Sequence, residues 1–133
     1  MALGQGVIVL GPHLGNWELH GMHLATLGNL VALHEPIPLK KLDQLMHRGR
    51  QCTGNKLVPT TPRGIADLVR SARAGGVTGI LPDQVPSDGN AGINAPFYGV
   101  ECFTAALESN LIKKSGATPS MGTVVRTEKG FRA

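Results

Sequence analysis

The chain has 133 residues, of which 41% are hydrophobic and 17% are charged, and its formal net charge is +4. This composition excludes a disordered chain and suits one domain with one core. The positive charge fits an acidic partner but does not separate nucleic acid, anionic lipid and an acidic carrier protein.

Apolar runs alternate with stretches of helical periodicity along the chain. In chain order, these patterns predict a strand at 7–10, a helix at 17–27, a strand at 30–33, a helix at 39–50, a strand at 56–59, a helix from about 61 to 74, a strand at 77–81, a loop at 82–103, a helix at 104–114 and a strand at 121–125. Such alternation predicts an α/β fold with a mainly parallel central sheet flanked by helices.

The two cysteines indicate the redox compartment of the protein, and the two ends of the chain indicate its place in a longer sequence. The spacing of Cys52 and Cys102 matches neither a CxxC pair nor a zinc-binding motif, and such isolated cysteines are typical of a reduced compartment. A strand begins a few residues after Met1, and a turn at 127–130 leads into what would be the second strand of a hairpin. We therefore expect an internal piece of a longer protein, in which the sheet is incomplete.

The most informative stretch, Gly11-Pro12-His13-Leu14-Gly15-Asn16-Trp17-Glu18, follows the first strand. If Asn16 caps the next helix, His13 lies in the turn before it and Glu18 lies in its first turn. A kinked turn can bring the imidazole and the carboxylate together, so that Glu18 fixes the tautomer of His13 and the free ring nitrogen acts as a general base. The alternative is a polar loop histidine and a glutamate that complements the helix dipole.

Charged residues follow two other predicted elements. Arg48 and Arg50 end the helix at 39–50, where they can complement the helix dipole or bind a phosphate or carboxylate. Asp83 follows the strand at 77–81, and sites in parallel sheets gather at the carboxyl ends of strands. A buried Asp83 would be a natural partner for one of the two arginines.

The remaining histidines raise a metal hypothesis. His20 and His23 lie three positions apart, and together with His13 and Asp83 they would suit a metal-dependent hydrolase. The HExxH motif is absent, and packed or solvated histidines are the commoner case. His34 and His47 form no recognisable constellation in the sequence. We therefore expect no metal and no cofactor.

Four blocks of sequence carry a family resemblance. They are His13-Leu14-Gly15-Asn16-Trp17-Glu18, Arg48-Gly49-Arg50, Leu81-Pro82-Asp83-Gln84-Val85-Pro86, and Ala95-Pro96-Phe97-Tyr98-Gly99 followed by Thr104. In this order they resemble the late acyltransferases of lipid A biosynthesis, the lauroyl/myristoyl transferases, which belong to the lysophospholipid acyltransferase-like superfamily. The resemblance covers nearly the whole chain, so residues 1–133 are expected to be part of an acyltransferase catalytic domain.

The resemblance implies a reaction and its setting. A fatty acyl group would move from acyl carrier protein, or a related thioester, to a hydroxyl of a lipid A precursor at the cytoplasmic face of the bacterial inner membrane, without a cofactor and without a nucleic-acid partner. Members carry an N-terminal membrane helix and continue past the end of this chain. An alternative acceptor is a lysophospholipid or another glycolipid, and an alternative class is a non-catalytic lipid-binding module.

The resemblance also assigns residues. His13 and Glu18 match the catalytic HX4(D/E) pair, and Arg50 and Asp83 match two further positions that the family needs. The substrate-binding residues expected on the same basis are Asn16, Trp17, Arg48, Gln84 and Phe97. We expect His13, oriented by Glu18, to deprotonate the acceptor hydroxyl, while backbone N–H groups of the turn or Arg50 hold the oxyanion.

Overall fold

A five-stranded parallel sheet forms the centre of the molecule, with strand order β3-β2-β4-β1-β7. The computed structural model describes residues 5–133. The strands of the sheet are β1 (Val7–Leu10), β2 (Leu30–His34), β3 (Lys56–Pro59), β4 (Val77–Ile80) and β7 (Thr118–Met121). The helices are α1 (Trp17–Leu27), α2 (Lys40–Gln51), α3 (Pro62–Arg73) and α4 (Leu107–Ser115). The predicted α/β class is confirmed.

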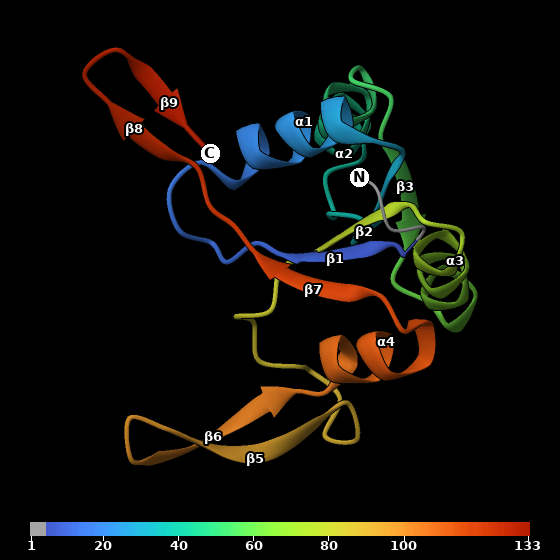
Figure 1. Cartoon of the computed structure of the whole chain (residues 1–133), viewed down its shortest axis with the longest axis vertical. Helices are drawn as coiled ribbons and strands as arrows, with labels where there is room; N and C mark the ends of the chain where they lie inside the picture. Colours follow the sequence, from blue (N-terminus) through green and yellow to red (C-terminus); the bar gives the residue numbers. More distant parts are fainter. Residues whose placement is uncertain (1–4) are drawn as a thin grey trace.

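Alternating side chains of the strands build a core on each face of the sheet. On one face, Ile8 of β1 packs with Leu68 of α3 and Leu111 of α4. On the other face, Val9 packs with Leu24 of α1. Figure 1 shows α1 and α2 on one side of the sheet and α4 on the other. Both faces are covered, which explains why β1 reads as a continuous apolar run in the sequence.

The neighbouring strands β1 and β4 form a topological switch point. The chain leaves β1 toward α1 on one face and leaves β4 toward α4 on the opposite face. In open α/β sheets such a point opens a crevice at the carboxyl ends of the strands, where ligands bind. The register pairs Leu10 with Ile80, so the segments that follow these two residues emerge side by side.

The second half of the chain departs from its predicted elements. The expected loop at 82–103 contains the hairpin strand β5 (Gly92–Phe97). The helix expected from Thr104 begins at Leu107, because Thr104 lies in the partner strand β6 (Val100–Ala105) and pairs with Ile93 of β5. The strand expected at 121–125 lies earlier in the chain, where β7 spans Thr118–Met121 and shares only Met121 with the expected range. Pro119 lowers the strand signal of this segment, but β7 is an edge strand, where a missing N–H is tolerated.

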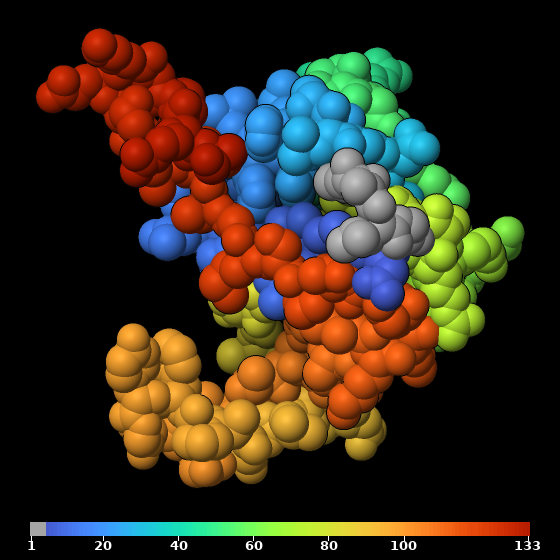
Figure 2. Space-filling model, viewed as in Figure 1, coloured from blue at the N-terminus to red at the C-terminus, as the bar shows by residue number. Residues whose placement is uncertain are grey.

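Two hairpins project from the body of the molecule. They are the β5–β6 hairpin and the hairpin of β8 (Val125–Thr127) with β9 (Gly130–Arg132), and Figure 2 shows both standing away from the packed layers. The second confirms the hairpin expected at the end of the chain. In residues 5–133, no helix has both the length and the apolar character required to cross a bilayer.

Helix α2 lies at the expected place but exposes its apolar residues. Leu39, just before it, and Leu45 are each 68% exposed, and Leu42 is 44% exposed. The periodicity correctly indicates an amphipathic helix, but it does not say which surface covers the apolar side. In α3, by contrast, the apolar side of the helix is in the core, with Leu68 and Ala72 buried.

Candidate active site

His13 and Asp83 form a dyad at the switch point. Each lies three residues beyond the paired positions Leu10 and Ile80, which places them opposite one another. Nδ1 of His13 lies 2.8 Å from Oδ1 of Asp83, and the backbone N–H of His13 donates to Oδ2 at 2.7 Å. An ionised carboxylate only accepts hydrogen bonds, so Nδ1 carries the proton and Nε2 keeps its lone pair.

The electrostatics of the dyad favour an ionised Asp83. Desolvation alone would raise the pKa of Asp83, but hydrogen bonds from the side chain and the backbone of His13 outweigh it and hold the pKa below its usual range. The His13 side chain is 35% exposed and that of Asp83 is 40% exposed, so the pair is open to a ligand. Within the described chain, Nε2 of His13 has no hydrogen-bond partner.

The turn that carries His13 is fixed by backbone contacts. Gly11 donates its N–H to Ile80, and Asn16 donates its N–H to Val124 at 2.8 Å. Gly15 has a φ of +71°, and a Cβ atom there would lie 2.1 Å from the carbonyl oxygen of Val124. A side chain at this position would therefore distort the turn, which explains the glycine in the His13 block.

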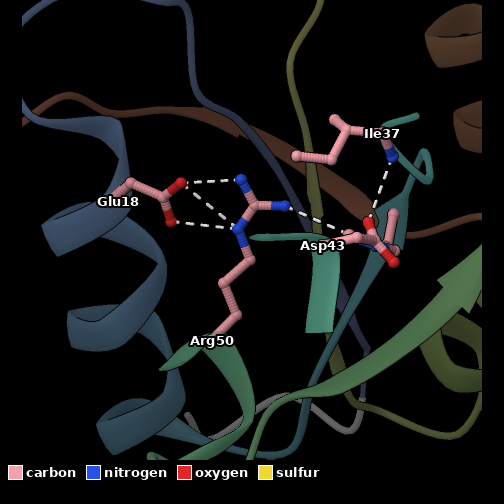
Figure 3. A network of polar contacts seen from close by, with 5 residues as sticks. Glu18, Ile37, Asp43 and Arg50 are labelled. Carbon is pink, nitrogen blue, oxygen red and sulfur yellow. Dashed lines mark hydrogen bonds and ion pairs between the residues drawn. The ribbon is translucent and has the colours of Figure 1, made fainter. Parts of the chain in front are cut away.

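Glu18 and Arg50 form a second pair beside the dyad. Nη2 of Arg50 donates to Oε1 of Glu18 at 2.6 Å, and Nε lies 3.2 and 3.1 Å from the two carboxylate oxygens (Figure 3). This is the forked geometry that binds a guanidinium most firmly. The Arg50 side chain is 20% exposed.

Trp17 lies between the two pairs. Its ring contacts that of His13 edge-on, with 5.4 Å between the centroids. The guanidinium carbon of Arg50 lies 5.0 Å from the centroid of the same indole, a cation–π contact. One aromatic side chain thus holds the imidazole on one side and the guanidinium on the other.

Arg50 also reaches a buried histidine that the sequence does not single out. Nη1 of Arg50 lies 3.2 Å from Nδ1 of His34, and Nε2 of His34 lies 3.0 Å from Oδ1 of Asp43. That oxygen also accepts the backbone N–H of Ile37 at 3.1 Å (Figure 3). The expectation that His34 belongs to no constellation is therefore wrong.

The partners of the predicted catalytic residues are exchanged relative to the expectation. The expected hydrogen bond from His13 to Glu18 is replaced by the bond from His13 to Asp83, and the expected ion pair of Asp83 with an arginine is replaced by that of Glu18. The cause is the strand order, because β4 is the neighbour of β1 and delivers Asp83 to the turn. The first turn of α1 instead directs Glu18 toward the last turn of α2.

An apolar cavity of about 80 Å³ adjoins this group. Its walls come from α1 and from the face of the sheet beneath it, and include Val9, Leu24, Leu30 and Leu57. Trp17, Glu18 and Arg50 line it as well. The site therefore joins charged groups to an apolar space.

A family model described as bacterial lipid A biosynthesis acyltransferase matches residues 2–132. The chain belongs to this family. A search of curated proteins found no match. The family resemblance inferred from the four sequence blocks is thereby confirmed, and the chain is that of a lipid A acyltransferase family member. A lipid A precursor is the substrate that the family suggests.

The residues expected to bind substrate in this acyltransferase do not form one cluster. Asn16 caps α1, because its side chain accepts the N–H of Leu19 at 3.0 Å. Trp17 lies in the site, while Arg48 and Gln84 are exposed. Phe97 is 65% exposed at the end of β5, where it contacts Tyr98. Substrate contacts by these residues remain predictions.

His20 and His23 lie apart from the dyad. His20 is buried, and a Cβ atom on Gly11 or Gly122 would approach its ring. Burial, followed by the charge of His23, lowers the pKa of His20. His20 is therefore a packed histidine, the case expected to be more common. In residues 5–133 no group of three or more metal-binding side chains is found.

The sequence motifs do not single out His34 and Asp43. A signal for them exists, because Asp43, His47 and Arg50 are spaced i, i+4 and i+7 and therefore share one face of α2. The strand that ends at His34 lies against that face.

Proposed function

We propose that this acyltransferase moves a fatty acyl group from acyl carrier protein to a hydroxyl of a lipid A precursor, with the His13–Asp83 dyad as its general base. The observation that carries the proposal is the 2.8 Å contact between Nδ1 of His13 and Asp83, which leaves Nε2 as the basic nitrogen. This is the arrangement by which a carboxylate orients a histidine in hydrolases of unrelated folds.

The reaction needs one base and no covalent intermediate with the protein. Nε2 of His13 takes the proton of the acceptor hydroxyl as its oxygen attacks the thioester carbonyl carbon. The tetrahedral intermediate then breaks its carbon–sulfur bond, and the departing thiolate receives the proton from the imidazolium. The products are an ester of the acceptor and the free thiol of the carrier.

Arg50 is placed to bind an anion near the base. A guanidinium has five N–H groups. Glu18 accepts one from Nε and one from Nη2, and His34 accepts one from Nη1. One N–H on Nη1 and one on Nη2 remain for a phosphate of the acceptor or for the oxyanion of the intermediate. Glu18 serves here by orienting Arg50 instead of His13.

The apolar cavity supports a fatty acyl substrate. Its lining includes aliphatic side chains of β1, α1, β2 and β3, and Trp17 connects it to the dyad. An acyl chain in this space gains the free energy of leaving water. The basic composition of the chain, with a net charge of +4, favours an acidic carrier protein and the anionic cytoplasmic face of the inner membrane.

The proposal is tested by incubating the full-length protein with radiolabelled acyl-acyl carrier protein and a lipid A precursor. We expect the label to appear in the precursor and the activity to persist in EDTA. We expect His13→Ala to lose at least about 100-fold in rate, and the control His23→Ala, on the exposed side of α1, to lose none. Loss of activity in EDTA would favour a metal-dependent enzyme.

Two further outcomes would redirect the proposal. Transfer only to a lysophospholipid would keep the base and replace the acceptor. Tight binding of lipid without transfer to either acceptor would contradict an enzymatic role and favour a lipid-binding module.

A further inference from the structure

We propose that a neutral His34 is a positioning residue for Arg50, held in one tautomer by Asp43 so that its Nδ1 accepts an N–H of the guanidinium. The role in catalysis rests on the proposed function, because it acts through Arg50. The tautomer itself rests only on the contacts of His34, and it can be tested separately.

The tautomer follows from what each partner can do. A guanidinium donates hydrogen bonds and accepts none, so Nδ1 of His34 must present a lone pair to Nη1 of Arg50. The proton of a neutral ring then lies on Nε2, which donates to Oδ1 of Asp43 at 3.0 Å. The His34 side chain is 8% exposed, so water does not compete freely for either nitrogen.

Asp43 is held as an acceptor by a second donor. The backbone N–H of Ile37 is the largest cause that lowers the pKa of Asp43, and the hydrogen bond from His34 lowers it further against the effect of desolvation. An ionised Asp43 has no proton to give, so it selects the Nε2–H form of His34 in the way that outer carboxylates select histidine tautomers at metal sites.

Within residues 5–133, the titratable and charged groups in direct contact with His34 come from α2. They are Asp43, His47, whose ring centroid lies 5.1 Å away, and Arg50, through which Glu18 of α1 is connected. A second proton, on Nδ1, would set the Nδ1–H of His34 against the Nη1–H of Arg50. It would also place a positive imidazolium beside the guanidinium. A neutral ring is therefore the form that holds the guanidinium.

The consequence for Arg50 is a fixed orientation. Glu18 binds the edge of the guanidinium formed by Nε and Nη2, His34 binds Nη1, and Trp17 lies against its face. Without His34, the Nη1 end of the group loses its hydrogen-bond partner, and the direction of its two free N–H groups is less fixed. A displacement of about 1 Å at a catalytic contact can cost about 100-fold in rate.

Steady-state kinetics of acyl transfer by the full-length protein test the positioning role. We expect His34→Phe to reduce kcat/KM by about 10- to 100-fold, and the matched control His23→Phe, on the exposed side of α1, to change it by less than about twofold. In an Arg50→Lys background, His34→Phe should add almost nothing, because the effect passes through Arg50. An equal loss in both backgrounds, or no loss in the wild-type background, would overturn the positioning role.

Nitrogen-15 NMR of the histidine rings in the full-length protein at pH 7.5 tests the tautomer without any substrate. We expect a proton on Nε2 of His34 and an unprotonated Nδ1, with the assignment made by loss of the signals in His34→Phe. A proton on Nδ1 would overturn the inference. If the wild-type protein transfers no acyl group, the proposed function fails, and this measurement still decides the state of His34.

Discussion

At the scale of single residues, four side chains that the sequence blocks point to lie in two pairs with exchanged partners. His13 and Asp83 are joined at 2.8 Å, and Glu18 and Arg50 at 2.6 Å. Residue types and spacing make these positions candidates, because all four follow the ends of strands or border a helix end, and the family resemblance assigns them. The pairing depends on which strands are neighbours, and spacing does not contain that information.

The pKa of Asp43 gives a residue-scale prediction about stability. Its pKa is lower in the folded state than the ordinary aspartate value, first because of the Ile37 N–H. The stabilisation is complete above the unfolded-state pKa and is lost as the pH falls through the folded-state pKa. Asp43→Asn should therefore lower the free energy of unfolding near neutral pH, and its difference from wild type should shrink on acidification.

Urea unfolding of wild type and Asp43→Asn at a series of pH values between about 7 and 3 measures this difference. Glu128→Gln, on the exposed turn of the β8–β9 hairpin, is the control and should follow the wild-type curve. A difference between wild type and Asp43→Asn that stays constant over the whole range would show that the charge of Asp43 does not contribute.

At the scale of elements, the turns and helix ends set where the site residues lie. The helix α1 begins at the predicted residue because Asn16 caps it. Helix α2 presents Asp43, His47 and Arg50 on one face, toward β2. The β5–β6 hairpin escaped prediction because its apolar residues, such as Ile93 and Val100, are exposed and follow no clean alternation toward a core.

Two glycines near the site should respond oppositely to alanine. Gly15→Ala is expected to destabilise the protein by about 1–3 kcal/mol, because φ is +71° and the Cβ atom would meet the carbonyl of Val124. Gly49→Ala should stabilise it by about 0.5–1 kcal/mol, because Gly49 lies inside α2 with open space around it. Urea unfolding measures both, and a stabilising Gly15→Ala would contradict the described turn.

At the scale of the whole molecule, the parallel sheet turns two distant segments into one site. The sequence predicted the class of fold and the alternation of elements, because apolar runs covered on both faces and helical periodicity are local signals. The strand order and the register of β1 with β4 are not local, and they bring Asp83 to His13 across 70 positions. The same order defines the crevice in which we propose that the acyl group is transferred.

The rate of acyl transfer by Asp83→Asn tests whether His13 and Asp83 together form the catalytic base. An amide there would donate to Nδ1 of His13 and turn Nε2 from a base into a donor. We predict a loss of about 100-fold or more in kcat, with a cooperative urea transition retained near pH 7 although its midpoint falls, and with wild-type rates for the loop control Asp88→Asn. A wild-type kcat in Asp83→Asn would contradict the His13–Asp83 base.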